Sequence, residues 1–146
     1  MKNPILYLLT LLPLSLGACM PNLSSESGIE RVKLKDSEVY FKREIRGLSY
    51  DVLVLSLSDT LCEMPDRRKD YVFQEQGPLR IYYKVENDVL NIYGTGRAQP
   101  PEVNLFKVNI VQHQLSVLEF DRLVKDAASL QLHLLEVPVS QNRKCR

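Results

Sequence analysis

Residues 79–93 read LRIYYKVENDVLNIY, and this stretch decides the fold class of the chain. Both of its halves, 79–85 and 89–93, are rich in aromatic and β-branched residues, which favour strands. Glu86-Asn87-Asp88 lies between the halves, and Asn and Asp tolerate the left-handed backbone angles that tight turns require. The stretch therefore predicts a β-hairpin.

Residues 50–58, YDVLVLSLS, predict the most deeply buried strand. Because side chains alternate along a strand, Val52 and Val54 share one face, while Leu53, Leu55 and Leu57 share the other. Both faces are apolar through the middle of the stretch, which is typical of a strand covered on both sides. We expect this strand to be central in its sheet.

The rest of the chain adds shorter strands and one helix. Further strands are predicted at 31–35, 38–42, 71–73, 103–112, 130–134 and 137–139. Residues 59–70 are expected to form a loop and 94–101 a long turn. Ser116 and Glu119 have the spacing of a capping box, and apolar residues follow at helical spacing, so a short helix is predicted over 117–128. This pattern predicts a mainly β fold, a small antiparallel β-sandwich or barrel of about six to eight strands.

Composition limits the class of partner. The chain has 19 Lys and Arg residues against 18 Asp and Glu residues. Nearly balanced charge gives no reason to expect nucleic acid as a partner, because nucleic-acid binding depends on an excess of cations.

The first 19 residues have the features of an export signal. Lys2 provides a positive start, residues 5–16 are mostly apolar, and Leu16-Gly17-Ala18-Cys19 ends the segment with small residues. The apolar run is about a dozen residues, whereas a membrane-spanning helix needs roughly 20. We therefore do not expect this segment to remain as a transmembrane anchor.

The ending Leu16-Gly17-Ala18-Cys19 resembles the lipobox of bacterial lipoproteins. The resemblance implies cleavage before Cys19 and attachment of fatty acyl chains such as palmitate to that cysteine. Met20 follows it, and the absence of Asp there resembles lipoproteins sent to the outer membrane, facing the periplasm. The alternative is ordinary cleavage after Ala18, which leaves a free thiol; the bulk of Leu16 disfavours this.

The resemblance also gives a domain organisation. Residues 1–18 would be the signal peptide and 19–28 an acylated anchor with a flexible, polar tether. Residues 29–146 would be a single periplasm-facing β domain, because about 128 residues after the signal are enough for one domain.

If Cys19 is acylated, Cys62 and Cys145 remain. In an exported protein two such thiols are more often paired than free, so a Cys62–Cys145 disulfide is predicted. It would close a loop of about 84 residues, for which chain entropy predicts roughly 4 to 5 kcal/mol of stabilisation. The alternative, a two-cysteine metal site, needs more ligands than the nearby sequence offers.

Two basic clusters would be brought together by that disulfide. We interpret the resulting positive patch as a contact for an acidic protein surface or for anionic lipid, and the alternative is a solvated rim. The candidate partner-binding residues are Arg67, Arg68, Lys69, Arg143 and Lys144.

The sequence offers no pattern that predicts catalysis, a metal or a cofactor. His113 and His133 are the only histidines, and no carboxylate or thiol repeats beside either at ligand spacing. No nucleophile-elbow pattern surrounds any serine.

We therefore expect a non-enzymatic, membrane-anchored protein-binding module of the cell envelope, held to the membrane through lipid on Cys19. A periplasmic immunity or inhibitor protein directed against a toxin is one role within this class, and a structural subunit of an envelope or secretion apparatus is another. The alternative from a different class is an envelope hydrolase with an unrecognised site.

Overall fold

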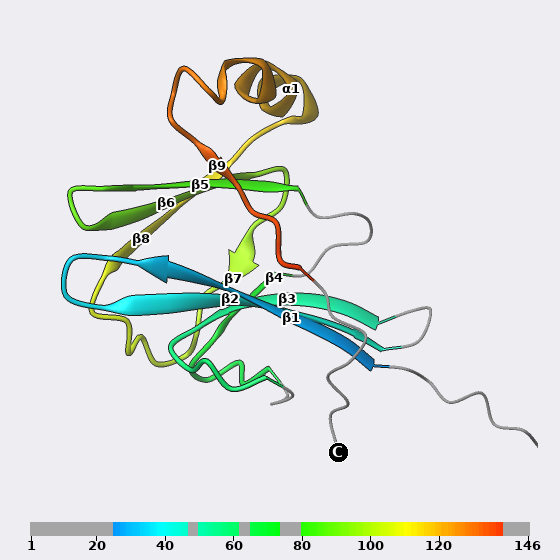
Figure 1. Cartoon of the computed structure of the whole chain (residues 1–146), viewed down its shortest axis with the longest axis vertical. Coiled ribbons are helices and arrows are strands. Elements are labelled where there is room, and N and C mark those ends of the chain that lie inside the picture. The colour runs from blue at the N-terminus through cyan, green and yellow to red at the C-terminus, as the bar shows by residue number, and fades with distance from the viewer. Residues whose placement is uncertain (1–24, 47–49, 62–64, 74–79, 139–146) are drawn as a thin grey trace, which may run out of the picture.

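The computed structural model describes residues 25–46, 50–61, 65–73 and 80–138, which form two β-sheets and one helix (Figure 1). The five-stranded sheet has the order β1-β2-β3-β4-β7, and the four-stranded sheet has the order β8-β6-β5-β9. The elements in chain order are β1 (Ser25–Lys33), β2 (Glu38–Arg46), β3 (Tyr50–Ser56), β4 (Tyr71–Phe73), β5 (Ile81–Glu86), β6 (Val89–Gly94), β7 (Ala98–Gln99), β8 (Asn109–Gln114), α1 (Val117–Asp126) and β9 (His133–Leu134).

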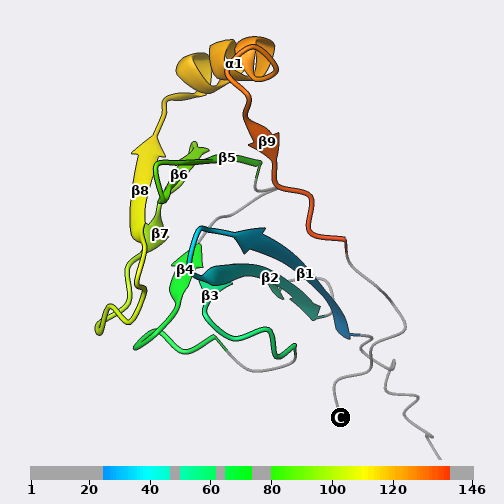
Figure 2. The ribbon, with the colours of Figure 1, turned by 60° about the vertical axis from the view of Figure 1, so that its left-hand side comes forward.

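The two sheets pack face to face as a small β-sandwich, not as a closed barrel (Figure 2). Neighbouring strands are antiparallel except β6 and β8, which are parallel because the chain between them leaves to form β7 in the other sheet. The predicted fold class is confirmed. The described residues form nine strands instead of six to eight, because β7 and β9, of two residues each, are too short to give a periodic signal.

The predicted hairpin is confirmed as β5 and β6, although β5 begins at Ile81 and includes Glu86, which was predicted in the turn; Leu79 lies outside the described residues. Its turn is the two residues Asn87 and Asp88, which have φ angles of 51° and 63°. Positive φ at both central residues gives a turn whose twist matches that of the flanking strands. The turn residues therefore fix the register that pairs Glu86 with Val89.

The core lies between the sheets and is built from alternate residues of both. Phe41 on β2 illustrates it: its ring centroid is 6.3 Å from that of Phe73 in the same sheet and 5.8 Å from that of Tyr83 in the opposite sheet. The buried side chains of this core are Val32, Val39, Phe41, Leu53, Leu55, Tyr71, Phe73, Ile81, Leu90, Ile92, Ala98, Phe106 and Val108.

The predicted central strand is confirmed as β3, which pairs with β2 on one side and β4 on the other. Leu53 and Leu55 face the core, and Val54 on the opposite face is also buried. The loop after β3 contributes to that burial, since Lys42 donates from its ammonium to the Thr60 carbonyl at 3.2 Å. Leu57 lies beyond the end of the strand and is exposed, so the predicted apolar face is one residue too long.

Helix α1 lies over the outer face of the four-stranded sheet (Figure 1). The predicted capping box is present, because the Ser116 hydroxyl accepts from the Glu119 N–H while the Glu119 carboxylate accepts from the Ser116 N–H. Phe120 is buried against Tyr82, with ring centroids 6.0 Å apart. The helix ends at Asp126, two residues before the predicted end.

The prediction of a flexible tether within residues 19–28 was wrong for residues 25–28. Residues 25–28 lie in β1, where they pair with residues 43–46 of β2. Ser27 and Gly28 are buried, although neither has an apolar side chain of the kind that predicts a buried strand. Backbone pairing and close packing, which need no apolar side chain, explain why hydropathy did not indicate a strand there. Residues 19–24 lie outside the described residues.

The predicted bounds of three strands in the C-terminal part of the chain were wrong. The strand expected at 103–112 begins only at Asn109. Before it, the side-chain oxygen of Asn104 accepts from the Phe106 N–H at 3.1 Å and forms a local turn. The alternation at 130–134 gives only β9. Of the strand predicted at 137–139, Val137 and Pro138 pass beside β1 without joining a described sheet, and Pro138 has no N–H to donate; Val139 lies outside the described residues.

Candidate functional site

The two lateral sides of the sandwich differ. On one side Gln112 of β8 bridges to β7 in the opposite sheet: its side-chain oxygen accepts from the Ala98 N–H at 2.7 Å, and its side-chain nitrogen donates to the Ala98 carbonyl at 3.2 Å. The side chain thus satisfies an edge of the five-stranded sheet and closes this side. On the other side, β1 faces β5 and β9.

This second side is joined at its two ends. At one end the Glu30 carboxylate accepts from the Tyr83 hydroxyl at 2.8 Å and from the Glu136 N–H at 3.2 Å, which connects β1, β5 and the segment after β9. At the other end the Lys35 N–H donates to the Asp88 carboxylate at 3.1 Å, which connects the two hairpin turns. Between these two connections the side of the sandwich remains open.

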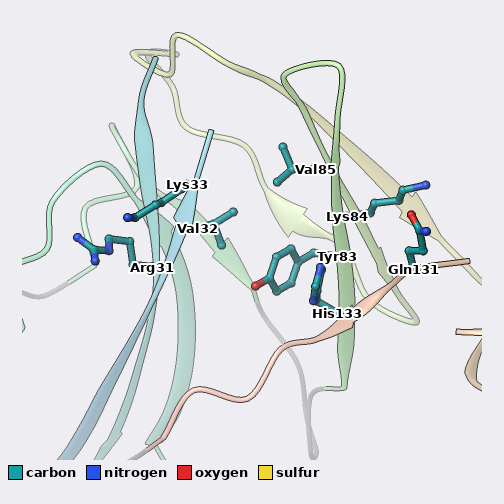
Figure 3. Close-up of a pocket in the computed structure, with 8 residues that line it drawn as sticks. All are labelled: Arg31, Val32, Lys33, Tyr83, Lys84, Val85, Gln131 and His133. Carbon is teal, nitrogen blue, oxygen red and sulfur yellow. The ribbon is translucent and has the colours of Figure 1, made fainter. Parts of the chain in front are cut away.

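A cleft of about 490 Å³ occupies the open part (Figure 3). At its base Val32 and Val85 point into the space between the strands and the Tyr83 ring lies beside them, while most of the exposed lining is polar. The residues that line it are Arg31, Val32, Lys33, Tyr83, Lys84, Val85, Gln131 and His133.

The rims of the cleft carry cations. Arg31 and Lys33 extend from β1 away from the interior, and Lys84 extends from the far side of β5 (Figure 3). No Asp or Glu is among the described residues that line the cleft. Arg31 lies 3.7 Å from Glu38, and Lys84 lies 3.3 Å from Glu86. These exposed pairs contribute little stability, so their cations remain available to a bound anion.

Tyr83 gives the cleft a rigid wall. Burial raises the pKa of its hydroxyl, and the hydrogen bond to Glu30 and the charge of that carboxylate raise it further. The hydroxyl therefore stays protonated and keeps donating to Glu30. The ring is also held by His133, whose centroid lies 5.5 Å away, as well as by Phe41 on the core side.

The two histidines lie in different places. His133 lines the cleft, but no serine or carboxylate is among the described residues that line it with this imidazole. His113 stacks on Tyr93 with centroids 4.4 Å apart and planes 8° from parallel, and its Nε2 lies 3.1 Å from the Asn91 side-chain oxygen. Within the described ranges, no three His, Cys, Asp or Glu residues are grouped as metal ligands would be.

The predicted basic loop is exposed but contributes no residue to the cleft. Arg67, Arg68 and Lys69 all lie on the surface, and the carbonyls of Arg67 and Arg68 accept from the N–H groups of Glu102 and Val103 at 3.3 and 2.9 Å. Lys69 borders a smaller hollow of about 180 Å³ with exposed Leu57 and Leu105.

The other predicted site residues lie outside the described residues. These are Cys19, Cys62, Cys145, Arg143 and Lys144. The lipid anchor, the disulfide and the joined basic patch therefore stay predictions.

The sequence did not indicate the cleft. Arg31, Lys33 and Lys84 occupy ordinary polar positions of alternating strands, and such positions are cationic on many solvated sheets. What makes them a group is the juxtaposition of β1 and β5, which are about 50 residues apart in sequence and meet only in the tertiary structure.

None of the described helices is long and apolar enough to cross a bilayer. Comparison with protein-family models, with curated proteins and with solved structures finds no match for this chain.

Proposed function

We propose that this protein is a binding module of the bacterial cell envelope, tethered through lipid on Cys19, which captures a partner protein in the cleft between β1 and β5. The observation that carries the proposal is the cleft itself, where Val32 and Val85 lie at the base and Arg31, Lys33 and Lys84 lie at the rims. Apolar contacts supply affinity in such a site, while surrounding charges select the partner and speed the encounter.

Binding accounts for the contents of the cleft better than catalysis does. A hydrolase would use His133 with a nucleophile or a carboxylate, and the described lining residues supply neither. Tyr83 is engaged with Glu30 and has a raised pKa, so it is a poor general base near neutral pH. The side chains present instead offer apolar contact and positive charge.

The cationic rims favour a partner with an acidic surface. Within this class, a periplasmic immunity or inhibitor protein directed against a toxin is one candidate, and a subunit of an envelope or secretion apparatus is the second. The predicted basic loop, Arg67 to Lys69, would be a further contact in either role. Identifying the partner by the crosslinking experiment described next would distinguish the two candidates.

Photocrosslinking in the living bacterium tests the proposal. A photoreactive side chain replaces Lys33 at the rim of the cleft, and in the matched control it replaces Lys125, which is exposed on α1. We expect one discrete crosslinked species from position 33 and none from position 125. Changing Arg31 and Lys84 to glutamine should reduce that species several-fold. Equal crosslinking from both positions would refute the cleft as the binding site.

Labelled palmitate tests the tether. The wild-type chain should incorporate the label and fractionate with membranes, while Cys19→Ser should do neither. A Cys19→Ser chain that still fractionates with membranes after export would exclude the lipid anchor.

A further inference from the structure

The open side of the sandwich exposes backbone hydrogen-bonding groups of β1. In the β1–β2 hairpin the Leu34 N–H donates to the Ser37 carbonyl at 2.9 Å, so Leu34 points its backbone groups toward β2. Backbone direction alternates in an antiparallel ladder, so the N–H and C=O of Arg31 and Lys33 point away from β2. Lys35 continues this series, and its N–H does point outward, to Asp88.

No described residue pairs with these groups of Arg31 and Lys33 on the outer side. The segment after β9 covers the same edge further back, where Glu136 bonds Glu30 and Pro138 lies against Gly28. Among the described residues, no strand lies beside this edge of two outward-facing residues, and unpaired strand edges are templates for strand addition.

On the opposite wall of the cleft, the edge of β5 is also left without a described strand partner at Val85. The Leu135 N–H donates to the Ile81 carbonyl at 2.8 Å, so the alternate residues Tyr83 and Val85 also point their backbone groups away from β6. Strand β9 begins at His133, opposite Tyr83, because the chain that arrives from α1 is still turning at Gln131, whose φ is 55°. Val85 is left facing the cleft.

We propose that the partner inserts an extended segment into the cleft as an added strand on β1, with alternating acidic and apolar residues. This inference rests on the proposed function and names its binding mode. Residues opposite Arg31 and Lys33 share the face of those cations, so acidic side chains there form cross-strand ion pairs. The residue opposite Val32 points inward, where an apolar side chain meets Val32 and Val85.

The arrangement follows strand addition as a general recognition mode, in which main-chain hydrogen bonds give affinity and alternate side chains give specificity. Three residues opposite 31–33 span about 10 Å. The connections Glu30–Tyr83 and Lys35–Asp88 lie at the two ends of that span. They hold the edges apart before the segment arrives, which lowers the ordering cost of binding.

Synthetic peptides test this mode with the full mature chain. The probe is a blocked heptapeptide of alternating glutamate and valine, of which the central Glu-Val-Glu lies opposite 31–33 while the two ends leave the cleft, and binding is measured by fluorescence anisotropy. In the proposed register the glutamate N–H groups face β1. We therefore expect N-methylation of the glutamate nitrogens to weaken binding at least tenfold, while N-methylation of the valine nitrogens changes it less than twofold.

Charge reversal gives a second, independent measurement. The variant Arg31→Glu with Lys33→Glu should lose at least tenfold in affinity for the glutamate peptide and gain affinity for the matching lysine peptide. The control variant Lys107→Glu with Lys125→Glu carries the same change in net charge on exposed positions outside the cleft, and it should bind as the wild type does.

Three results would overturn the proposal: no binding of the glutamate peptide at millimolar concentration, equal binding of both N-methylated forms, or dimerisation of the wild-type chain through this edge in light scattering. If any of them is obtained while the crosslink from position 33 persists in cells, strand addition is wrong and the binding module stands. Loss of that crosslink refutes the proposed function instead.

Discussion

Replacing Gly28 by alanine should destabilise the sandwich at the point where its C-terminal segment crosses β1. A Cβ at this position would lie 2.8 Å from the Pro138 carbonyl carbon and 3.0 Å from Val137 Cγ1, and it would be closer still to the Pro138 carbonyl oxygen. Contacts with backbone atoms are not relieved by rotating a side chain. Either β1 or the crossing segment must therefore shift.

The magnitude follows from what is lost in that shift. Overpacking of this kind costs about 1 to 3 kcal/mol. Release of the segment instead would remove about 1 kcal/mol for the hydrogen bond from the Glu136 N–H to Glu30, together with part of the burial of Val137. Alanine restricts the unfolded chain and returns up to about 1 kcal/mol. A cost near the middle of the overpacking range, less this gain, leaves an expected net loss of about 1 to 2 kcal/mol.

Urea unfolding followed by circular dichroism measures this loss, and Gly94→Ala is the matched control. Gly94 is also buried in a strand, but the nearest atom to its added Cβ is 3.5 Å away, an ordinary contact. The control should change stability by less than about 0.5 kcal/mol, typical of substitutions that disturb no packing. Equal stabilities of Gly28→Ala and wild type would refute the close crossing of β1.

Three further perturbations test the contacts that shape the sandwich. Gln112→Ala should lose about 2 kcal/mol in urea unfolding, because it leaves a buried N–H of β7 without its partner, whereas exposed Gln114→Ala should be near neutral. Ser116→Ala removes the cap of α1 and should cost about 1 kcal/mol, with a matching loss of helical signal on mild heating. Burial raises the pKa of Tyr83 above its ordinary value near 10, so the stability that the protonated hydroxyl contributes is complete below that pH and is lost as pH rises toward the folded pKa. Tyr83→Phe should therefore lose less stability than the wild type above pH 10. Equal dependence of the unfolding free energy on pH in the two proteins would contradict the Glu30 contact.

The cleft depends on where the ladder of β5 and β9 ends. If the chain continued straight through Gln131, a longer β9 would cover Val85 and fill the open side. Instead, the positive φ of Gln131 and the bond from the Leu132 N–H to the Ala127 carbonyl at 2.9 Å hold residues 131 and 132 in the turn that follows α1, so β9 begins only at His133. The helix therefore covers the outer face of the four-stranded sheet while its connection leaves the lateral side open.

Local chemistry was sufficient to predict the elements whose signals lie within a few residues. Asn87 and Asp88 fix the β5–β6 turn through their own backbone preferences, and Ser116 with Glu119 fixes the start of α1 through hydrogen bonds three residues apart. The apolar residues of β3 predicted a strand covered on both faces, because burial on each side requires apolar side chains at consecutive positions.

Only the tertiary structure decided which edges meet and what lies between them. Ser25 to Gly28 form a strand because β2 offers them backbone partners, and nothing in their own side chains carries that information. Gln112 closes one side of the sandwich by bonding Ala98, fourteen residues away, while Arg31 and Lys33 border an open side whose other wall is Val85. Alternation along a strand specifies which face is buried, but it does not specify the neighbour at the edge, because every strand offers the same backbone groups there.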